Sequence, residues 1–312
     1  MTDCRLVSLL PSATEIVHFL GMTDYLVGRS HECDFPETVK ELPVCTAPKF
    51  HPEGNSLTIH QQVSEILKQA LSVYEVKVEL LQELQPTHII TQDQCEVCAV
   101  SIADVESAVQ DFLASDTKII SLQPNLLHEV WLDIARVGEI LGVEYQHRIA
   151  ELQQRVEQVR VTCSRVKHRP RTACIEWIEP LMSAGNWIPE LIELAGGINL
   201  FGTAGRHSSW LQWEELLASD PEVIIFMPCG FDLDRTTAEV RQAWCNPQWQ
   251  KLQAVRHNQV YLTDGNSYFN RPGPRLVESL EILREILHPE LGESKHYQTG
   301  WRKYHGYRSV ER

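Results

Sequence analysis

Histidine and cysteine side chains gather in two polar segments of the first half of the chain. His31 and Cys33 lie in RSHECD (residues 29–34), and Cys95 and Cys98 lie in QDQCEVC (residues 92–98). The Cys-x-x-Cys spacing suits half of a zinc site or a redox pair, but no second pair and no His-x-x-x-His follows. A metal held by Cys95 and Cys98 would therefore have to recruit His31 or Cys33 from the neighbouring strand end. The alternative is that the two cysteines are small side chains that line a loop.

Aromatic side chains in the second half have the right character for a wall of a large binding site. Six aromatic residues fall near the ends of expected strands or in the loops beyond them: Trp177, Trp187, Trp210, Trp213, Tyr268 and Phe269. Several such rings facing one cleft would make a flat apolar surface suited to a large ring system. Packing in the core is the other explanation for some of them.

The sequence carries none of the common catalytic or phosphate-binding motifs. There is no Ser-His-Asp elbow, no P-loop and no Gly-x-Gly-x-x-Gly, and Gly196-Gly197 has the position of a helix stop. The sequence therefore predicts a binding protein and not an enzyme.

Composition limits the partners of the protein. The 312 residues carry a formal net charge of −14, which repels phosphate backbones and anionic lipid surfaces, so no nucleic acid is expected as a partner. No stretch approaches the roughly 20 apolar residues that span a bilayer, so a membrane-embedded protein is not expected either.

The first residues of the sequence and its cysteines indicate the cellular compartment in which the protein is expected. Residues 1–21 contain neither a basic segment nor a long apolar segment typical of a signal peptide. The nine cysteines are scattered and odd in number, which is typical of reduced thiols. We expect a cytoplasmic protein, with the periplasm as the alternative if the true start lies upstream.

Strands alternate with helices in both halves, which predicts a parallel sheet in each. In the first half Ser12 and Glu15 form a capping box that would start a helix ending at Gly21. Ser101 would cap a second helix. The other elements expected in the first half are strands at 5–10, 25–28, 88–91 and 118–122, and a helical pattern at 65–84. In the second half they are a strand at 172–177, a helix at 190–195 and a buried strand ending in VIIFM.

A long amphipathic helix is predicted for residues 144–166, because apolar side chains recur there at alternating spacings of three and four. From Pro289 the chain is polar and without periodicity, which suggests a tail on the surface. The expected organisation is an N-terminal α/β lobe at 1–125, linking and bridging helices at 126–166, a C-terminal α/β lobe at 167–290 and a tail at 291–312.

Several segments resemble one family in the same order. They are RLVSLLPSATEIVHFLG, LVGRSHECDFP, LLQELQPTHIIT, EWIEPLMSAGNWIPELIELAGGINLFG, Ser209-Trp210 before an acidic helix, and SYFNRPGPRLVESL. Over residues 5–289 the chain is similar to the cobalamin-binding proteins of ABC importers. These belong to the helical-backbone class of periplasmic binding proteins, and this chain looks like a leaderless branch of them.

The resemblance implies two lobes bridged by one long helix, the class III periplasmic-binding-protein or chelatase-like fold, with the ligand held between the lobes. By motif position Trp210 matches a tryptophan that packs on the corrin ring. Tyr268, Phe269 and Arg271 match the last ligand loop, and Ser12 and Ala13 match the first. The family docks on its permease through one glutamate of each lobe, for which Glu53 and either Glu214 or Glu215 are the candidates.

We therefore expect a corrinoid ligand, cobalamin or a precursor, and as partner an ABC permease or an intracellular cobalamin-handling protein. A metal, haem or siderophore binder that uses the histidine and cysteines is the alternative, and a tetrapyrrole-processing enzyme is a further one. The expected ligand-binding residues are Ser12, Ala13, His31, Gln92, Asp93, Trp177, Trp187, Trp210, Tyr268, Phe269 and Arg271, and the candidate metal ligands are His31, Cys33, Cys95 and Cys98.

Overall fold

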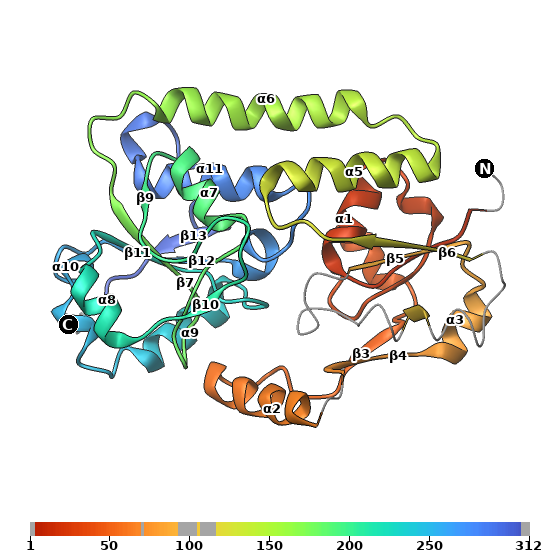
Figure 1. Ribbon diagram of the computed structural model, residues 1–312, viewed down its shortest axis with the longest axis horizontal. Helices are drawn as coiled ribbons and strands as arrows, with labels where there is room; N and C mark the ends of the chain where they lie inside the picture. Colours follow the sequence, from red (N-terminus) through yellow and green to blue (C-terminus); the bar gives the residue numbers. More distant parts are fainter. Residues whose placement is uncertain (1–3, 70–71, 93–104, 107–116, 307–312) are drawn as a thin grey trace. The chain divides into compact units, whose positions relative to one another are not determined.

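The computed structural model describes residues 4–69, 72–92, 105–106 and 117–306, and the chain forms two α/β units (Figure 1). The first unit comprises residues 1–54, 58–124 and 128–150, and the second comprises residues 55–57, 125–127 and 151–312. The alternation of strands and helices thus produces a sheet in each half of the chain, as the sequence predicts.

The first unit is built on a four-stranded parallel sheet with the order β2-β1-β5-β6. A two-stranded antiparallel sheet, β3-β4, lies beside it in the same unit. In chain order the elements are β1 (Leu6–Ser8), α1 (Pro11–Phe19), β2 (Leu26–Arg29), β3 (Thr46–Pro48), α2 (Ser56–Lys68), β4 (Tyr74–Val76), α3 (Val78–Leu84), β5 (His88–Gln92), β6 (Lys118–Leu122) and α5 (Leu127–Leu141). The apolar runs read as strands in the sequence all become strands of the parallel sheet.

The start of α1 differs from the expected capping box. The helix begins at Pro11, its N-cap is Leu10, and no side chain caps it. Proline suits the first turn because the amide hydrogen it lacks would have no partner within the helix. Ser12 and Glu15 are both buried in the first turns, each 2% exposed, so neither side chain serves as a cap.

The helical pattern expected over residues 65–84 is also wrong. Helix α2 ends at Lys68, and Val76 and Tyr74 then pair with Thr46 and Pro48 of β3 before α3 begins. Val73 and Tyr74 are buried, and β-branched and aromatic residues favour a half-buried pleated surface. Pairing with a strand distant in sequence therefore overrides a local helical spacing. Most of the helix expected from Ser101 falls outside the described residues.

The second unit contains a larger mixed sheet with the order β10-β8-β7-β11-β12-β13, and β9 also pairs with β7. Strands β7, β11 and β12 are parallel, while β8 and β13 are antiparallel to their neighbours. In chain order the elements are α6 (Gln146–Cys163), β7 (Arg171–Trp177), β8 (Met182–Ser183), α7 (Ile188–Leu194), β9 (Ile198–Asn199), β10 (Ser209–Trp210), α8 (Trp213–Ser219), β11 (Val223–Phe226), α9 (Leu233–Ala243), α10 (Gln253–Arg256), β12 (Val260–Thr263), a π-turn (Gly265–Phe269), α11 (Leu276–Leu287) and β13 (Trp301–Lys303).

The long helix predicted over residues 144–166 is α6, which runs for 18 residues. Its expected apolar stripe faces inward, since Ile149, Leu152, Val159 and Cys163 are buried. Residues 146–150 of this helix belong to the first unit and residues 151–163 to the second. One continuous helix therefore carries residues of both units.

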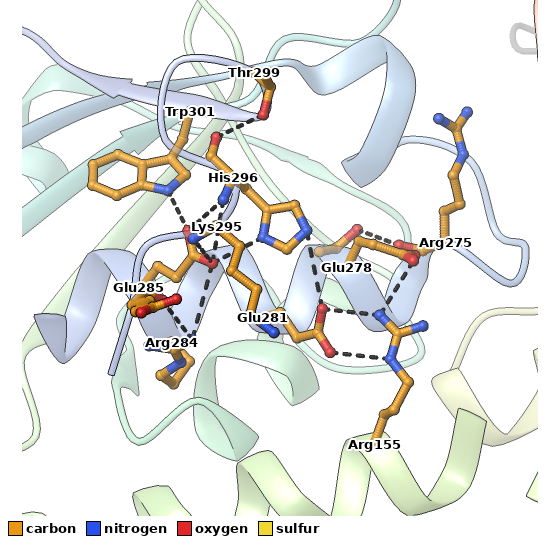
Figure 2. Close-up of polar contacts among 12 residues, drawn as sticks. Arg155, Arg275, Glu278, Glu281, Arg284, Glu285, Lys295, His296, Thr299 and Trp301 are labelled. Atoms are coloured by element: carbon orange, nitrogen blue, oxygen red, sulfur yellow. Dashed lines mark hydrogen bonds and ion pairs between the residues drawn. The ribbon is translucent and has the colours of Figure 1, made fainter. Parts of the chain in front are cut away.

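Residues 289–306 are built into the second unit, so the expectation of a surface tail is wrong there. Strand β13 pairs with β12, and Trp301 and Tyr304 are buried. Figure 2 shows how the segment is held: the Glu285 carboxylate on α11 accepts hydrogen bonds from the Trp301 indole at 2.7 Å and from His296 Nδ1 at 2.9 Å. The backbone amide of Lys295 also donates to Glu285, at 3.0 Å. A tail without periodicity is thus ordered by polar contacts that no spacing rule reveals.

The Glu285 carboxylate gives a testable link between pH and stability. Burial alone would raise its pKa, but the hydrogen bonds from His296 and Trp301 outweigh burial and hold the pKa below its ordinary value. A carboxyl with a lowered folded-state pKa stabilises the fold at neutral pH, and this contribution is lost as the pH falls through the folded-state pKa.

We predict that Glu285→Gln lowers the free energy of unfolding by about 2 kcal/mol at pH 7, because charge-assisted hydrogen bonds are lost. The difference in the free energy of unfolding between wild type and variant should decrease below about pH 4.5. Urea unfolding between pH 3.5 and 7 measures both effects. The exposed Glu293→Gln is the control and should match wild type. A gap that stays constant down to the lowest pH would contradict the assignment.

Candidate functional site

Three of the expected ligand-binding residues lie at one edge of the sheet in the first unit. Ser12 follows β1, His31 follows β2, and Gln92 ends β5. These strands are parallel neighbours, so their carboxyl ends share one edge, which is where open α/β sheets bind ligands. Asp93 lies outside the described residues.

The side chains that follow β1 are enclosed. Ser12 is 2% exposed and Ala13 is fully buried. Within the described residues, Ser12 Oγ is buried without a hydrogen-bond partner. The structure thus places both residues at the expected edge but does not expose them there.

His31 is held by contacts on two sides. Its Nδ1 lies 2.7 Å from Thr46 Oγ1, its backbone amide donates to the same oxygen at 3.1 Å, and its ring lies 5.3 Å from the Tyr74 ring. Burial, together with the positive charges of Lys77 and Arg29, lowers the pKa of His31 to about 4. The imidazole is therefore neutral at physiological pH.

The loop that follows β2 is shaped by Arg29 and closed over Cys33. The Arg29 guanidinium donates to the carbonyl oxygens of Ser30 and Cys33 at 3.0 and 3.1 Å and to that of Lys40 at 3.0 Å. Cys33 is 1% exposed, and its Sγ accepts a hydrogen bond from Thr14 Oγ1 at 3.0 Å. Its thiol is thus part of the packing between this loop and α1.

Of the candidate metal ligands, only His31 and Cys33 lie in the part of the chain that the structure describes. Nowhere in residues 4–69, 72–92, 105–106 and 117–306 do three His, Cys, Asp or Glu side chains come together in a group that could hold a metal ion. Cys95 and Cys98 lie outside these ranges, so the prediction that involves them stays a prediction.

Trp177 and Trp210 are brought together in the second unit by two short antiparallel strands. Met182 of β8 is the direct cross-strand partner of Trp177 on one side and of Trp210 on the other. Direct partners in an antiparallel pair point to the same face of the sheet. This holds for Met182 and Trp210, whereas the register shifts between Ile175 and Trp177 in the β7–β8 pair. The three residues are thus paired in a row across β7, β8 and β10, and Trp210 at the sheet edge is 53% exposed. We call Trp177, Met182 and Trp210 the aromatic strip.

Trp187 and Phe269 do not belong to an exposed wall, which corrects the sequence expectation. They are 5% and 0% exposed, and the Trp187 indole donates to the Phe269 carbonyl oxygen at 2.9 Å. Both are core residues that fix the turn after β12. Sequence position near a strand end did not distinguish them from Trp210.

The turn Gly265–Phe269 carries Tyr268 in a defined position. The Arg275 guanidinium lies 5.5 Å from the Tyr268 ring centre, and the His296 ring meets it edge-on at 6.2 Å. Ser279 Oγ donates to the Tyr268 carbonyl oxygen at 2.9 Å. Tyr268 is half-buried, so part of its ring remains accessible.

Arg271, expected in the same ligand loop, is 4% exposed and donates to Asn266 Oδ1 at 2.9 Å. Its guanidinium is thus committed at least in part to holding the turn. Sequence reasoning missed Met182 and Thr46, the partners that position Trp210 and His31. Both lie in ordinary-looking segments, and only strand pairing and packing reveal them.

The two α/β units, their parallel strands and the single long helix define the class III fold of periplasmic binding proteins. The family model described as "Periplasmic binding protein" matches residues 6–266, so the chain belongs to this family. Members of this class are binding components of ABC importers and perform no catalysis, which confirms the prediction of a binding protein.

Curated relatives cover most of the chain at low identity. An ABC transporter substrate-binding lipoprotein of Bacillus subtilis is 22% identical over 92% of this chain and 80% of its own length. A vitamin B12-binding protein of Vibrio cholerae is 24% identical over 89% of this chain and 86% of its own length.

Solved structures agree on the fold but differ in ligand. A periplasmic heme-binding protein from Roseiflexus superposes with a TM-score of 0.68 at 21% identity, covering 93% of this chain and 99% of that one. The periplasmic vitamin B12-binding protein of Vibrio cholerae gives 0.64 at 20% identity, with 93% and 98% covered. Identities this low show the fold alone.

None of the helices in the described ranges combines the length and the apolar character needed to cross a membrane.

The core role of Trp187 can be tested. Trp187→Phe keeps an aromatic ring but removes the indole donor, leaving the Phe269 carbonyl oxygen buried without it. We predict a loss of about 1–3 kcal/mol in the free energy of unfolding, measured by urea denaturation. Trp177→Phe, at a half-buried position, is the control and should cost less. Equal losses for the two variants would argue against the assigned hydrogen bond.

Proposed function

We propose that this protein binds a corrinoid, cobalamin or a precursor, as a substrate-binding protein. The observation that carries the proposal is the aromatic strip, in which Trp210 stays 53% exposed on a two-residue edge strand. An indole that is more than half exposed contributes little to the core, and aromatic side chains of this kind provide much of the apolar contact in ligand sites.

The polar groups on the first unit favour a ligand whose peripheral groups are uncharged. The neutral imidazole of His31 follows one strand there, and the amide of Gln92, which is 6% exposed, ends another. Amide side chains of a corrin need neutral donors and acceptors of this sort, whereas carboxylates pair best with arginine or lysine. The vitamin B12-binding proteins among the relatives support the same choice.

The proposal extends to the partner, an ABC permease or an intracellular cobalamin-handling protein. Of the candidate docking residues, Glu53, Glu214 and Glu215 are all exposed. Glu215 accepts from the backbone amide of Gln212 at 3.0 Å in the capping box of α8. Glu214 is therefore the better candidate on the second unit, because within the described ranges its carboxylate makes no such capping hydrogen bond.

The compartment is likewise a proposal. All seven cysteines in the described ranges are free thiols, and several are deeply buried. Free thiols suit a reducing compartment, which supports the cytoplasm. Fractionation of cells that carry the full-length gene, followed by immunoblotting, tests this location against the periplasm.

The proposed function predicts that Trp210→Ala weakens cobalamin binding by about 2 kcal/mol, or roughly 30-fold in Kd, with little change in Tm. The reason is that an exposed indole gives up contact with the ligand but little core packing. Calorimetric titration and thermal melts measure the two effects.

The matched control is Tyr297→Ala, which removes an aromatic side chain that is 46% exposed in the same unit. It should bind cobalamin like wild type. If wild type itself shows no binding at tens of micromolar cobalamin, the corrinoid assignment falls.

A further inference from the structure

The hydrogen bonds around Thr46 determine which nitrogen of His31 carries the proton. Thr46 Oγ1 donates its single hydrogen to Ser30 Oγ at 3.1 Å. Toward His31 the hydroxyl can then only accept, and it does so from the backbone amide and from the ring. The neutral ring must therefore carry its hydrogen on Nδ1.

This assignment leaves Nε2 as a bare acceptor with an available lone pair. Within the described residues Nε2 has no hydrogen-bond partner, and it is not a buried atom. The side chain is half-buried, so the ring is fixed while this nitrogen reaches solvent. The Tyr74 ring at 5.3 Å and the Thr46 hydroxyl restrict rotation of the imidazole.

The arrangement is the one that metal-binding histidines use. Such a histidine donates its second ring N–H to a fixed acceptor, which sets the tautomer, orients the ring and raises the basicity of the free nitrogen. Here the acceptor is the Thr46 hydroxyl, locked by its own bond to Ser30. A histidine kept only for packing has no need of a free, oriented lone pair at a strand end where ligands bind.

We propose that His31 Nε2 coordinates the central metal of the bound ring, as an axial ligand that replaces an exchangeable water. This inference rests on the proposed function and narrows it to metal-centred macrocycles with one labile axial position. In the exchange the metal–oxygen bond breaks, the nitrogen lone pair forms a metal–nitrogen bond, and water leaves without change of oxidation state. Thr46 is a positioning residue in this scheme.

Two cobalamins separate ligation from binding. Aquocobalamin has an exchangeable water on its upper face, whereas cyanocobalamin carries a tightly held cyanide there. Wild type should bind both and should shift the visible absorption bands of aquocobalamin alone. In His31→Ala the shift should disappear, and the preference for aquocobalamin over cyanocobalamin, as a ratio of Kd values, should fall about tenfold or more.

Two further variants control the test. Thr46→Val keeps the size of the side chain but removes the acceptor, so it should reduce both the shift and the preference. His18 also has Nδ1 beside a threonine hydroxyl, at 2.9 Å from Thr23 Oγ1, but it lies in the last turn of α1, away from the strand ends. His18→Ala should behave like wild type.

A measurement on the unaltered protein covers the case in which a His31 variant fails to fold. Cobalt(II) cobinamide, which lacks its own nucleotide base, should show nitrogen superhyperfine splitting in its EPR spectrum when bound. The splitting should change from triplets to doublets when the protein is grown with 15N-histidine.

The outcomes distinguish the two proposals. If wild type binds cyanocobalamin but gives no shift and no splitting, or if the shift persists in a folded His31→Ala, axial ligation is overturned and corrinoid binding stands. If wild type binds neither cobalamin, the proposed function falls and the ligation falls with it.

Discussion

In the second unit a carboxylate with almost no exposure, that of Glu285, organises a network of contacts around it (Figure 2). Its oxygens accept from the Trp301 indole, the His296 ring and the backbone amide of Lys295, which offsets the cost of burying a charge. His296 in turn lies edge-on to Tyr268, and Nε2 of the same ring lies 4.0 Å from Glu281. Glu281 pairs with Arg155 of α6, so the segment after α11, the long helix and the turn after β12 are all tied to one buried charge.

Most of the framework was predictable because it depends on short-range patterns. Apolar runs that end at a polar segment became the parallel strands, and the apolar stripe of α6 is visible in its spacing. The sequence predictions fail where contacts with residues distant in the chain determine the local structure. Residues 74–76 form a strand because they pair with β3. The segment around Trp301 is ordered because Trp301 donates a hydrogen bond to the buried Glu285 carboxylate. Neither partner can be read from local spacing.

In the candidate site, too, some features could be predicted from the sequence and others depend on the folded structure. The strand-end rule directs attention to His31, which follows β2, and the composition of the loops directs attention to the tryptophans. Loop composition cannot distinguish Trp187, which follows β8, from Trp210, which ends β10 of the same sheet; only burial separates them. The Thr46–Ser30 hydroxyl pair, which sets the state of His31, links positions 16 residues apart through side chains of unremarkable type. Chemistry of this kind is a property of the folded contacts and not of a motif.

The position of β13 has a consequence for how the second unit is made. Every other strand of its sheet precedes β13 in the chain, so the edge of β12 stays unpaired on the ribosome until residues 301–303 emerge. During that interval the unit exposes a row of free backbone groups, together with the Tyr261 ring and the Glu285 carboxylate that Trp301 later contacts. Synthesis therefore produces an incomplete sheet first and closes it last, and a prematurely terminated chain would be a natural target for chaperones and proteases.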